Sequence, residues 1–210
     1  MTAALTLESL SAVRNERTLF ANLSLTVSAG EAVMLVGPNG VGKTTLLRLI
    51  AGFIAPAAGA VALSPADGER DVPQRAQLVG ARDPLKAALS VRELLQGWRD
   101  IVYPGEAEGD SIERVLDALD LARLADIPCG YLSSGQRRRV SLARLGLSHA
   151  ARRPLWLLDE PTNALDAAAR ARLAALVAAH RAGGGMVLAA SHDPLDWPAL
   201  GRLDLAAARG

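Results

Sequence analysis

The chain has 210 residues, half of them hydrophobic, and its 23 Lys and Arg side chains balance 22 Asp and Glu side chains. This composition excludes a disordered chain, and a formal net charge of +1 gives no general attraction to nucleic acid or to anionic lipid. The single cysteine, Cys129, excludes an internal disulfide and favours a reducing compartment. Without an apolar run of about 18 residues or a basic segment before an apolar one, we expect neither a membrane-spanning helix nor a signal peptide.

Hydrophobic periodicity predicts strands and helices that alternate along the chain. Period-two patterns or short apolar runs predict strands at 4–13, 22–27, 31–37, 59–63, 76–81, 154–161, 185–191 and 203–208, the last of them at a sheet edge. Helical spacing predicts helices at 43–52, 91–98, 111–124, 137–150 and 166–182, and a Pro/Asp/Gly/Arg-rich stretch at 64–75 predicts a loop.

This order of elements indicates an α/β fold with a mainly parallel sheet, an antiparallel N-terminal β part and an inserted helical lobe. We expect one domain over 1–210, with a core formed by 1–80 and 146–210 and a lobe at about 81–145. No internal repeat is present in the sequence.

The stretch "GPNGVGKT" (37–44) follows a buried strand and opens a helix, and it fits the phosphate-loop pattern G-x-x-x-x-G-K-T. In such a loop the backbone N–H groups and the helix N-terminus face phosphate oxygens. Lys43 would reach the β- and γ-phosphates, and the Thr44 hydroxyl would hold Mg²⁺. The alternative, a Gly-rich turn that caps an unrelated helix, is disfavoured because Lys43 is one of only two lysines in an arginine-rich chain. The candidate nucleotide-binding residues here are Gly37, Pro38, Asn39, Gly40, Val41, Gly42, Lys43, Thr44 and Thr45.

Two carboxylates, Asp159 and Glu160, end the buried strand in "PLWLLDEP". Ligands of open α/β sheets bind at such strand ends. Asp159 is suited to hold Mg²⁺, and Glu160 is then free to orient and polarise the attacking water. A solvated Asp-Glu-Pro turn is the alternative, but the phosphate loop upstream favours catalysis.

A second anion site is predicted by "LSSGQ" (132–136), a loop of small residues at the start of a helix. Ser133, Ser134, Gly135 and Gln136 would offer N–H groups and hydroxyls to phosphate. One nucleotide does not need two phosphate-binding loops from the same chain. We therefore expect this loop to contact a nucleotide that is bound by another copy of the chain.

Together these stretches resemble the ATP-binding subunits of ATP-binding-cassette (ABC) transporters, over the whole chain and in the family's order. "GPNGVGKT" resembles Walker A, "LSSGQ" the signature loop and "LWLLDE" Walker B. "NALD" (163–166) resembles the D-loop, which makes Asp166 a candidate nucleotide contact, and "AASHD" contains the switch histidine, His192. The resemblance implies ATP and Mg²⁺ as ligands, ATP hydrolysis with His192 at the γ-phosphate, and two copies of the chain that enclose two ATP molecules.

Three positions depart from the family pattern. Ser134 replaces a glycine of the signature, a change that we expect to preserve the phosphate contact. Ala81 stands where these ATPases have a glutamine that senses Mg²⁺ and the attacking water, and Gln77 lies on the preceding strand, where it cannot easily substitute. Arg14 stands where an aromatic residue stacks on adenine; a guanidinium can also stack on a π face.

Within the family, the short chain, the missing glutamine and "LSSGQRRRVSLARL" resemble the ATPase of the haem exporter in bacterial cytochrome c maturation. This resemblance implies a peripheral position on the cytoplasmic side of the inner membrane, integral membrane subunits as partners, haem-handling proteins as indirect partners, and no nucleic acid. The alternatives are the ATPase of another small exporter and an ABC ATPase that acts on DNA or ribosomes. A nucleotide kinase would share the phosphate loop but not the signature or His192.

The arginines behind the signature loop are interpreted as structural. Arg137, Arg138 and Arg139 lie on different faces of one helix, so we expect a solvated helix face rather than a nucleic-acid site, with one of the three aiding phosphate attraction or pairing with a nearby carboxylate. His149 and His180 match no motif and are expected at the surface or at helix ends.

Overall fold

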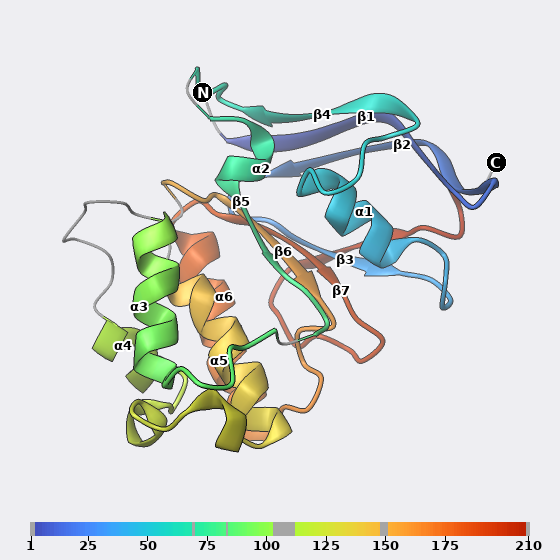
Figure 1. Cartoon of the computed structure of the whole chain (residues 1–210). Coiled ribbons are helices and arrows are strands. Elements are labelled where there is room, and N and C mark those ends of the chain that lie inside the picture. Colours follow the sequence, from blue (N-terminus) through green and yellow to red (C-terminus); the bar gives the residue numbers. More distant parts are fainter. Residues whose placement is uncertain (1–2, 69, 83, 103–111, 148–150, 209–210) are drawn as a thin grey trace.

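The computed structural model of the chain describes residues 3–68, 70–82, 84–102, 112–147 and 151–208. Its strands form a parallel five-stranded sheet in the order β5-β6-β7-β3-β8 and an antiparallel three-stranded sheet in the order β2-β1-β4. Helix α1 lies between the two sheets, and α3, α5 and α6 cover the other face of the larger sheet (Figure 1). The predicted α/β class, with its parallel sheet and antiparallel N-terminal part, is confirmed.

The bounds of the elements follow the chain. The strands are β1 Ala4–Arg14, β2 Arg17–Ser28, β3 Ala32–Val36, β4 Ala58–Ser64, β5 Ala76–Val79, β6 Leu155–Asp159, β7 Met186–Ala190 and β8 Leu200–Asp204. The helices are α1 Lys43–Ile50, α2 Val72–Arg75, α3 Val91–Val102, α4 Ile112–Ala118, α5 Ser134–Gly146 and α6 Ala167–Ala182, with 3-10 turns η1 Ala122–Leu124 and η2 Cys129–Tyr131.

The central strands β3, β6 and β7 are apolar apart from Asp159 at the end of β6, because both faces of the larger sheet are buried. Along β6, Leu155 and Leu157 face the hydrophobic cluster that contains α1 and the smaller sheet. Trp156 and Leu158 face the cluster that contains α3, α5 and α6. This alternation follows from the two-residue period of a strand, and it places the carboxyl end of β6 at the junction of the two clusters.

Several element boundaries differ from the predicted ones; strand β2, for example, begins at Arg17 rather than at 22. The predicted loop at 64–75 ends in the short helix α2, which begins with a capping box in which Asp71 and Gln74 bond to each other's backbone N–H groups. Helix α5 begins at Ser134 rather than at 137, and β8 begins at Leu200, before the predicted edge strand. The predicted helical lobe contains α3, α4, η1, η2 and nearly all of α5, and its division from the core stays a prediction. Residues 103–110 and the end of the predicted helix 137–150 lie outside the described residues.

The interpretation of the three arginines as a solvated helix face is wrong for Arg138, whereas the expected pairing of one of them with a nearby carboxylate is confirmed for Arg139. Arg138 is only 1% exposed, because its helical position turns it to the same side as the buried Ser141, Leu142 and Leu145. Arg139 donates to the backbone carbonyl oxygens of Leu119 and Asp120 and pairs with the Asp120 carboxylate. Of the three, Arg137 is the one that is exposed.

His180 is buried rather than at the surface, although it does lie in the last turn of α6. Its imidazole stacks on Trp156 of β6, with ring centroids 3.7 Å apart, and its Nε2 lies 3.3 Å from the carbonyl oxygen of Pro154. Burial lowers the pKa of His180 to about 4, although hydrogen bonds to backbone carbonyls raise it. The neutral ring is therefore the form that the fold stabilises. His149 lies outside the described residues.

A neutral buried His180 predicts acid lability. Below the ordinary histidine pKa of 6.5 the unfolded chain binds a proton that the folded chain excludes until about pH 4. The free energy of unfolding should fall by about 3 kcal/mol over this interval because of His180. His180→Phe, which keeps a ring against Trp156, should remove this part of the pH dependence in urea titrations at stepwise pH. An unchanged dependence in the variant would contradict the assignment.

Among the described residues, no helix is both long enough and apolar enough to cross a lipid bilayer.

Candidate nucleotide-binding site

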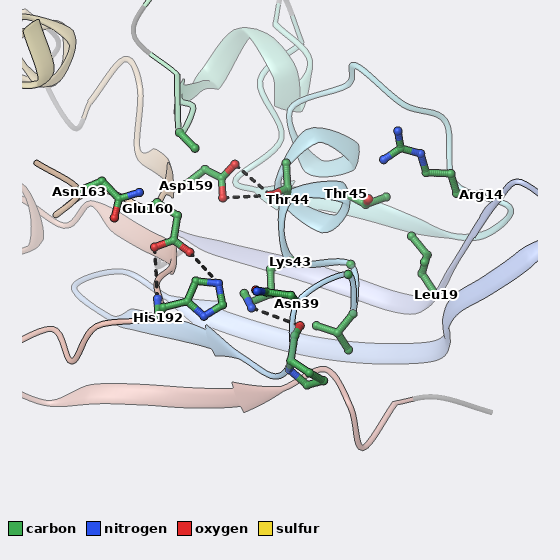
Figure 2. A pocket seen from close by; sticks show the side chains of 15 residues that line it. Arg14, Leu19, Asn39, Lys43, Thr44, Thr45, Asp159, Glu160, Asn163 and His192 are labelled. Atoms are coloured by element: carbon green, nitrogen blue, oxygen red, sulfur yellow. Dashed lines mark hydrogen bonds and ion pairs between the residues drawn. The ribbon is translucent and has the colours of Figure 1, made fainter. Parts of the chain in front are cut away.

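A cavity of about 570 Å³ lies at the carboxyl end of the larger sheet, beside the N-terminus of α1. Figure 2 shows that side chains from the phosphate loop, the end of β6 and the segment after β7 converge on it. Its lining contains Arg14, Leu19, Pro38, Asn39, Gly40, Val41, Gly42, Lys43, Thr44, Thr45, Ala81, Asp159, Glu160, Asn163 and His192. The structure thus brings together residues that are far apart in the sequence.

The phosphate loop has the backbone shape that a bound anion requires. Gly42, immediately before α1, adopts φ +116°, and a Cβ added there would lie 3.2 Å from the Phe20 ring. Glycine alone combines that φ with this close approach. The loop therefore meets the start of α1, where the unpaired N–H groups and the helix dipole attract negative charge.

Lys43 lies within the loop rather than in solvent. Its side chain is largely buried, and its ammonium group donates to the Gly37 carbonyl oxygen at 2.7 Å and to the Pro38 carbonyl oxygen at 3.5 Å. Two backbone acceptors leave part of the donor capacity of an ammonium group for an anion in the cavity. A compact cation is thus held where the loop N–H groups converge.

Thr44 and Asp159 face each other across the cavity floor. The Thr44 hydroxyl lies 3.1 Å and 3.0 Å from the two carboxylate oxygens of Asp159, as the dashed lines in Figure 2 mark. Asp159 is 5% exposed, at the end of β6. A hydroxyl and a carboxylate form an oxygen donor set that suits Mg²⁺, so the residues present fit that ion.

Glu160 and His192 form a second pair one residue beyond Asp159. The His192 backbone N–H donates to Glu160 Oε2 at 3.2 Å, and His192 Nε2 lies 3.4 Å from Glu160 Oε1. Glu160 follows β6 and His192 follows β7, and these strands are hydrogen-bonded neighbours. A left-handed backbone at Glu160, with φ +48°, turns its side chain away from the strand direction.

The side of the cavity near Arg14 and Leu19 contains no aromatic lining residue among the described ones. Arg14 ends β1 and is exposed, with its guanidinium directed over this side in Figure 2. Ala81 also lines the cavity, whereas Gln77 is buried within β5 and does not. Among the described residues, the lining of the cavity contains no glutamine.

The signature loop does not line this cavity. The Ser133 hydroxyl caps α5 by accepting from the Gln136 N–H, and Gln136 Oε1 accepts from the Ser133 N–H. A Cβ on Gly135 would lie 2.8 Å from the Ala164 carbonyl oxygen, so the D-loop packs closely against the start of α5. Asp166 caps α6 by accepting from the Ala169 N–H at 2.8 Å, and it too lies outside the lining.

Apart from Ala81, which the sequence marks only as the position without a glutamine, two lining residues lie outside the predicted set. Asn163 opens the D-loop stretch "NALD", so that motif contained the signal. Leu19 lies within β2, and no feature of the sequence marked it.

The sequence profile of the ABC transporter family matches residues 20–163, a segment that contains the phosphate loop, the signature loop and the acidic strand end. The chain belongs to the ABC transporter family. It is 48% identical over 184 residues to the cytochrome c biogenesis ATP-binding export protein CcmA of Nitrobacter winogradskyi, covering 87% of this chain and 88% of that protein. It is 46% identical over 190 residues to CcmA of Brucella abortus, covering 90% of this chain and 85% of that protein.

Among solved structures of the ABC family, cbiO1 from Clostridium perfringens, part of the transporter complex cbiONQ, has a TM-score of 0.70 and 25% sequence identity. The match covers 90% of this chain and 78% of that chain. As an ABC-family ATP-binding protein, the chain binds and hydrolyses ATP. ATP-binding subunits of this family dimerise and work with membrane subunits.

Proposed function

We propose that the chain is the ATP-hydrolysing subunit of the haem exporter that acts in c-type cytochrome biogenesis. The observation that carries this proposal is the similarity to proteins named as cytochrome c biogenesis ATP-binding export proteins, at 46–48% identity over most of the chain. The convergence of a phosphate loop, two carboxylates and a histidine in one cavity supports the enzymatic part.

The phosphate loop binds the triphosphate of ATP. The backbone N–H groups of 37–45 and the N-terminus of α1 surround the phosphates, and Lys43 neutralises charge on the β- and γ-phosphates. Arg14 stacks on the adenine in place of an aromatic ring. Thr44 and Asp159 would hold Mg²⁺, which would supply positive charge that neutralises the phosphates.

Glu160 accepts a hydrogen bond from the attacking water and orients it in line with the bond to be broken. The water oxygen forms a bond to the γ-phosphorus and its proton passes to Glu160, as the bond between that phosphorus and the bridging oxygen breaks, which yields ADP and inorganic phosphate. Lys43 and His192 donate hydrogen bonds to the charge that develops. Glu160 and His192 already contact each other, so both groups are oriented before ATP arrives.

Two copies of the chain enclose two ATP molecules. The signature residues Ser133, Ser134, Gly135 and Gln136 lie outside the cavity of their own chain, and they contact ATP held by the phosphate loop of the second copy. The D-loop with Asp166 packs against the signature and joins the same interface. Hydrolysis removes the γ-phosphate that both copies contact, so the dimer reopens and the membrane subunits respond.

Ser133→Arg tests the role of the signature loop. An arginine at this exposed helix cap should prevent two copies from closing on ATP, so we expect ATP-dependent dimerisation and turnover to be lost. ATP binding by the single chain should be unchanged, because the altered residue does not line the chain's own cavity. Light scattering with and without ATP measures the first effect, and Ser133→Ala is the conservative control. Cooperative turnover by Ser133→Arg would contradict the assignment.

The proposed position is peripheral, on the cytoplasmic side of the bacterial inner membrane, with integral membrane subunits as partners and haem-handling proteins as indirect ones. A deletion strain should lack covalently bound haem in its c-type cytochromes, as detected by haem staining. The wild-type gene should restore the signal, and a gene encoding Glu160→Gln should not. Normal c-type cytochromes in the deletion strain would contradict the biological role and leave the ATPase assignment in place.

A further inference from the structure

Arg138 on α5 reaches the backbone at the carboxyl ends of two neighbouring strands. Its Nε donates to the carbonyl oxygen of Pro161 at 3.3 Å, and its Nη1 donates to that of Gly80 at 2.7 Å. Its Nη2 donates to the carbonyl oxygens of Asp159 and Glu160, at 3.0 Å and 2.8 Å. One buried guanidinium thus binds the residue after β5 and three consecutive residues at the end of β6.

Loss of these hydrogen bonds would raise the free energy of the folded state. A buried charge requires hydrogen-bond partners, and a buried carbonyl left without a donor costs about 1–3 kcal/mol. The same guanidinium satisfies four carbonyl oxygens whose partial negative charges in turn stabilise it. The convergence of successive carbonyls on one cation therefore stabilises a particular backbone path at the end of β6.

That path includes the left-handed turn at Glu160. A non-glycine residue at φ +48° costs free energy that the surrounding contacts must supply. The bond from Arg138 to the Glu160 carbonyl oxygen lies at this turn, on the backbone of the residue whose side chain contacts His192. The direction of the Glu160 carboxylate is thus coupled to the position of Arg138.

Arg138 also ties this turn to the signature loop. It lies one helical turn after Ser134, the first residue of α5, and Ser133 caps the same helix. Because helix α5 is a rigid element, a shift of the signature loop shifts Arg138 with it. Arg138 also contacts Gly80, so it links the Glu160 turn to the residue directly before Ala81. Ala81 is the position at which other members of the family have a glutamine.

We propose that Arg138 is a positioning residue for ATP hydrolysis. It holds the left-handed turn at Glu160 in place and links this turn to helix α5, which begins at the signature loop. This inference rests on the proposed role of Glu160. Arginine suits the task because its five N–H donors lie in one plane, whereas lysine offers three donors on a single nitrogen. Lysine at 138 can therefore keep the charge but cannot reach all four carbonyl oxygens together.

The test compares Arg138→Lys, Arg138→Met and the control Arg172→Met, which alters an exposed arginine on α6. In the full chain with its partners, kcat should fall by about 100-fold in Arg138→Met, as misplacement of a catalytic group by about 1 Å can cause. Arg138→Lys should lie between Arg138→Met and wild type. KM and the affinity for a fluorescent ATP analogue should change little, because Arg138 does not line the cavity.

A second measurement separates positioning from general stability. Amide hydrogen exchange should become faster in a peptide covering 159–163 in both variants at position 138, at temperatures where each is folded. The phosphate-loop peptide and Arg172→Met should exchange as in wild type. If Arg138→Met does not fold, the role of Arg138 is tested with Arg138→Lys alone, by its kcat and by the rate of amide hydrogen exchange at 159–163.

Wild-type kcat per folded molecule in the Arg138 variants, or unchanged exchange at 159–163, would overturn the inference. Glu160→Gln is measured in parallel. Lost turnover in Glu160→Gln combined with normal turnover in Arg138→Met would refute only the role of Arg138. Full turnover in Glu160→Gln would refute the proposed chemistry on which that role depends.

Discussion

Glu160→Gln is expected to bind ATP with normal affinity and to hydrolyse it at least about 100-fold more slowly, as the loss of a general base typically causes. The amide keeps the size of the carboxylate and can still contact His192, so the cavity should be preserved. It cannot accept a proton from the attacking water. Because the γ-phosphate then persists between two copies, the variant should also accumulate as a dimer in the presence of ATP and Mg²⁺.

Steady-state turnover and light scattering measure these two effects, with Glu8→Gln as the matched control on the exposed surface of β1. If turnover is lost but no ATP-dependent dimer forms, Glu160 is required for hydrolysis and the proposed dimer with two enclosed ATP molecules is contradicted. Turnover equal to that of wild type would remove Glu160 from the mechanism.

Lys43→Ala is expected to weaken ATP binding by about 100-fold, because charge-assisted hydrogen bonds contribute about 1.5–3 kcal/mol each. The variant also loses the bonds from the ammonium group to the Gly37 and Pro38 carbonyl oxygens, which hold the loop around the phosphates. Lys43→Arg should restore little of the affinity, since its wide guanidinium does not fit where a compact ammonium lies. Both effects are read from the titration of a fluorescent ATP analogue.

The control for this substitution is Lys86→Ala, which removes the other lysine of the chain from an exposed position. Its affinity for ATP should equal that of wild type. Unchanged affinity in Lys43→Ala would mean that the phosphate loop does not bind the nucleotide.

Local pattern was sufficient to predict the fold class and most of the residues that line the cavity. Each of the two decisive motifs follows a buried strand. The first is a Gly-rich loop with a lysine and the second is a pair of carboxylates, and together they are typical of phosphate binding and hydrolysis. Parallel strands bring their carboxyl ends to one edge of the sheet, so Lys43, Asp159, Glu160 and His192 lie in one cavity although they are distant in the sequence.

The surroundings of Arg138 and His180 could not be predicted in the same way. Both are polar residues in helices, and residue type alone favours an exposed position for arginine. Arg138 is buried because carbonyl oxygens from two strand ends converge on it, and His180 is buried because Trp156 offers a ring of suitable orientation. These partners lie on other elements, so only tertiary packing reveals them.

In the proposed dimer, each catalytic site combines the phosphate loop of one copy with the signature loop of the other. Mixing the Lys43→Ala and Ser133→Arg chains and measuring ATP turnover tests this shared site. Each variant alone lacks one half of every site, but a mixed dimer contains one site with both Lys43 and Ser133 intact. The mixture should therefore recover turnover that neither variant shows alone. A mixture no more active than the sum of its two components would contradict the shared site.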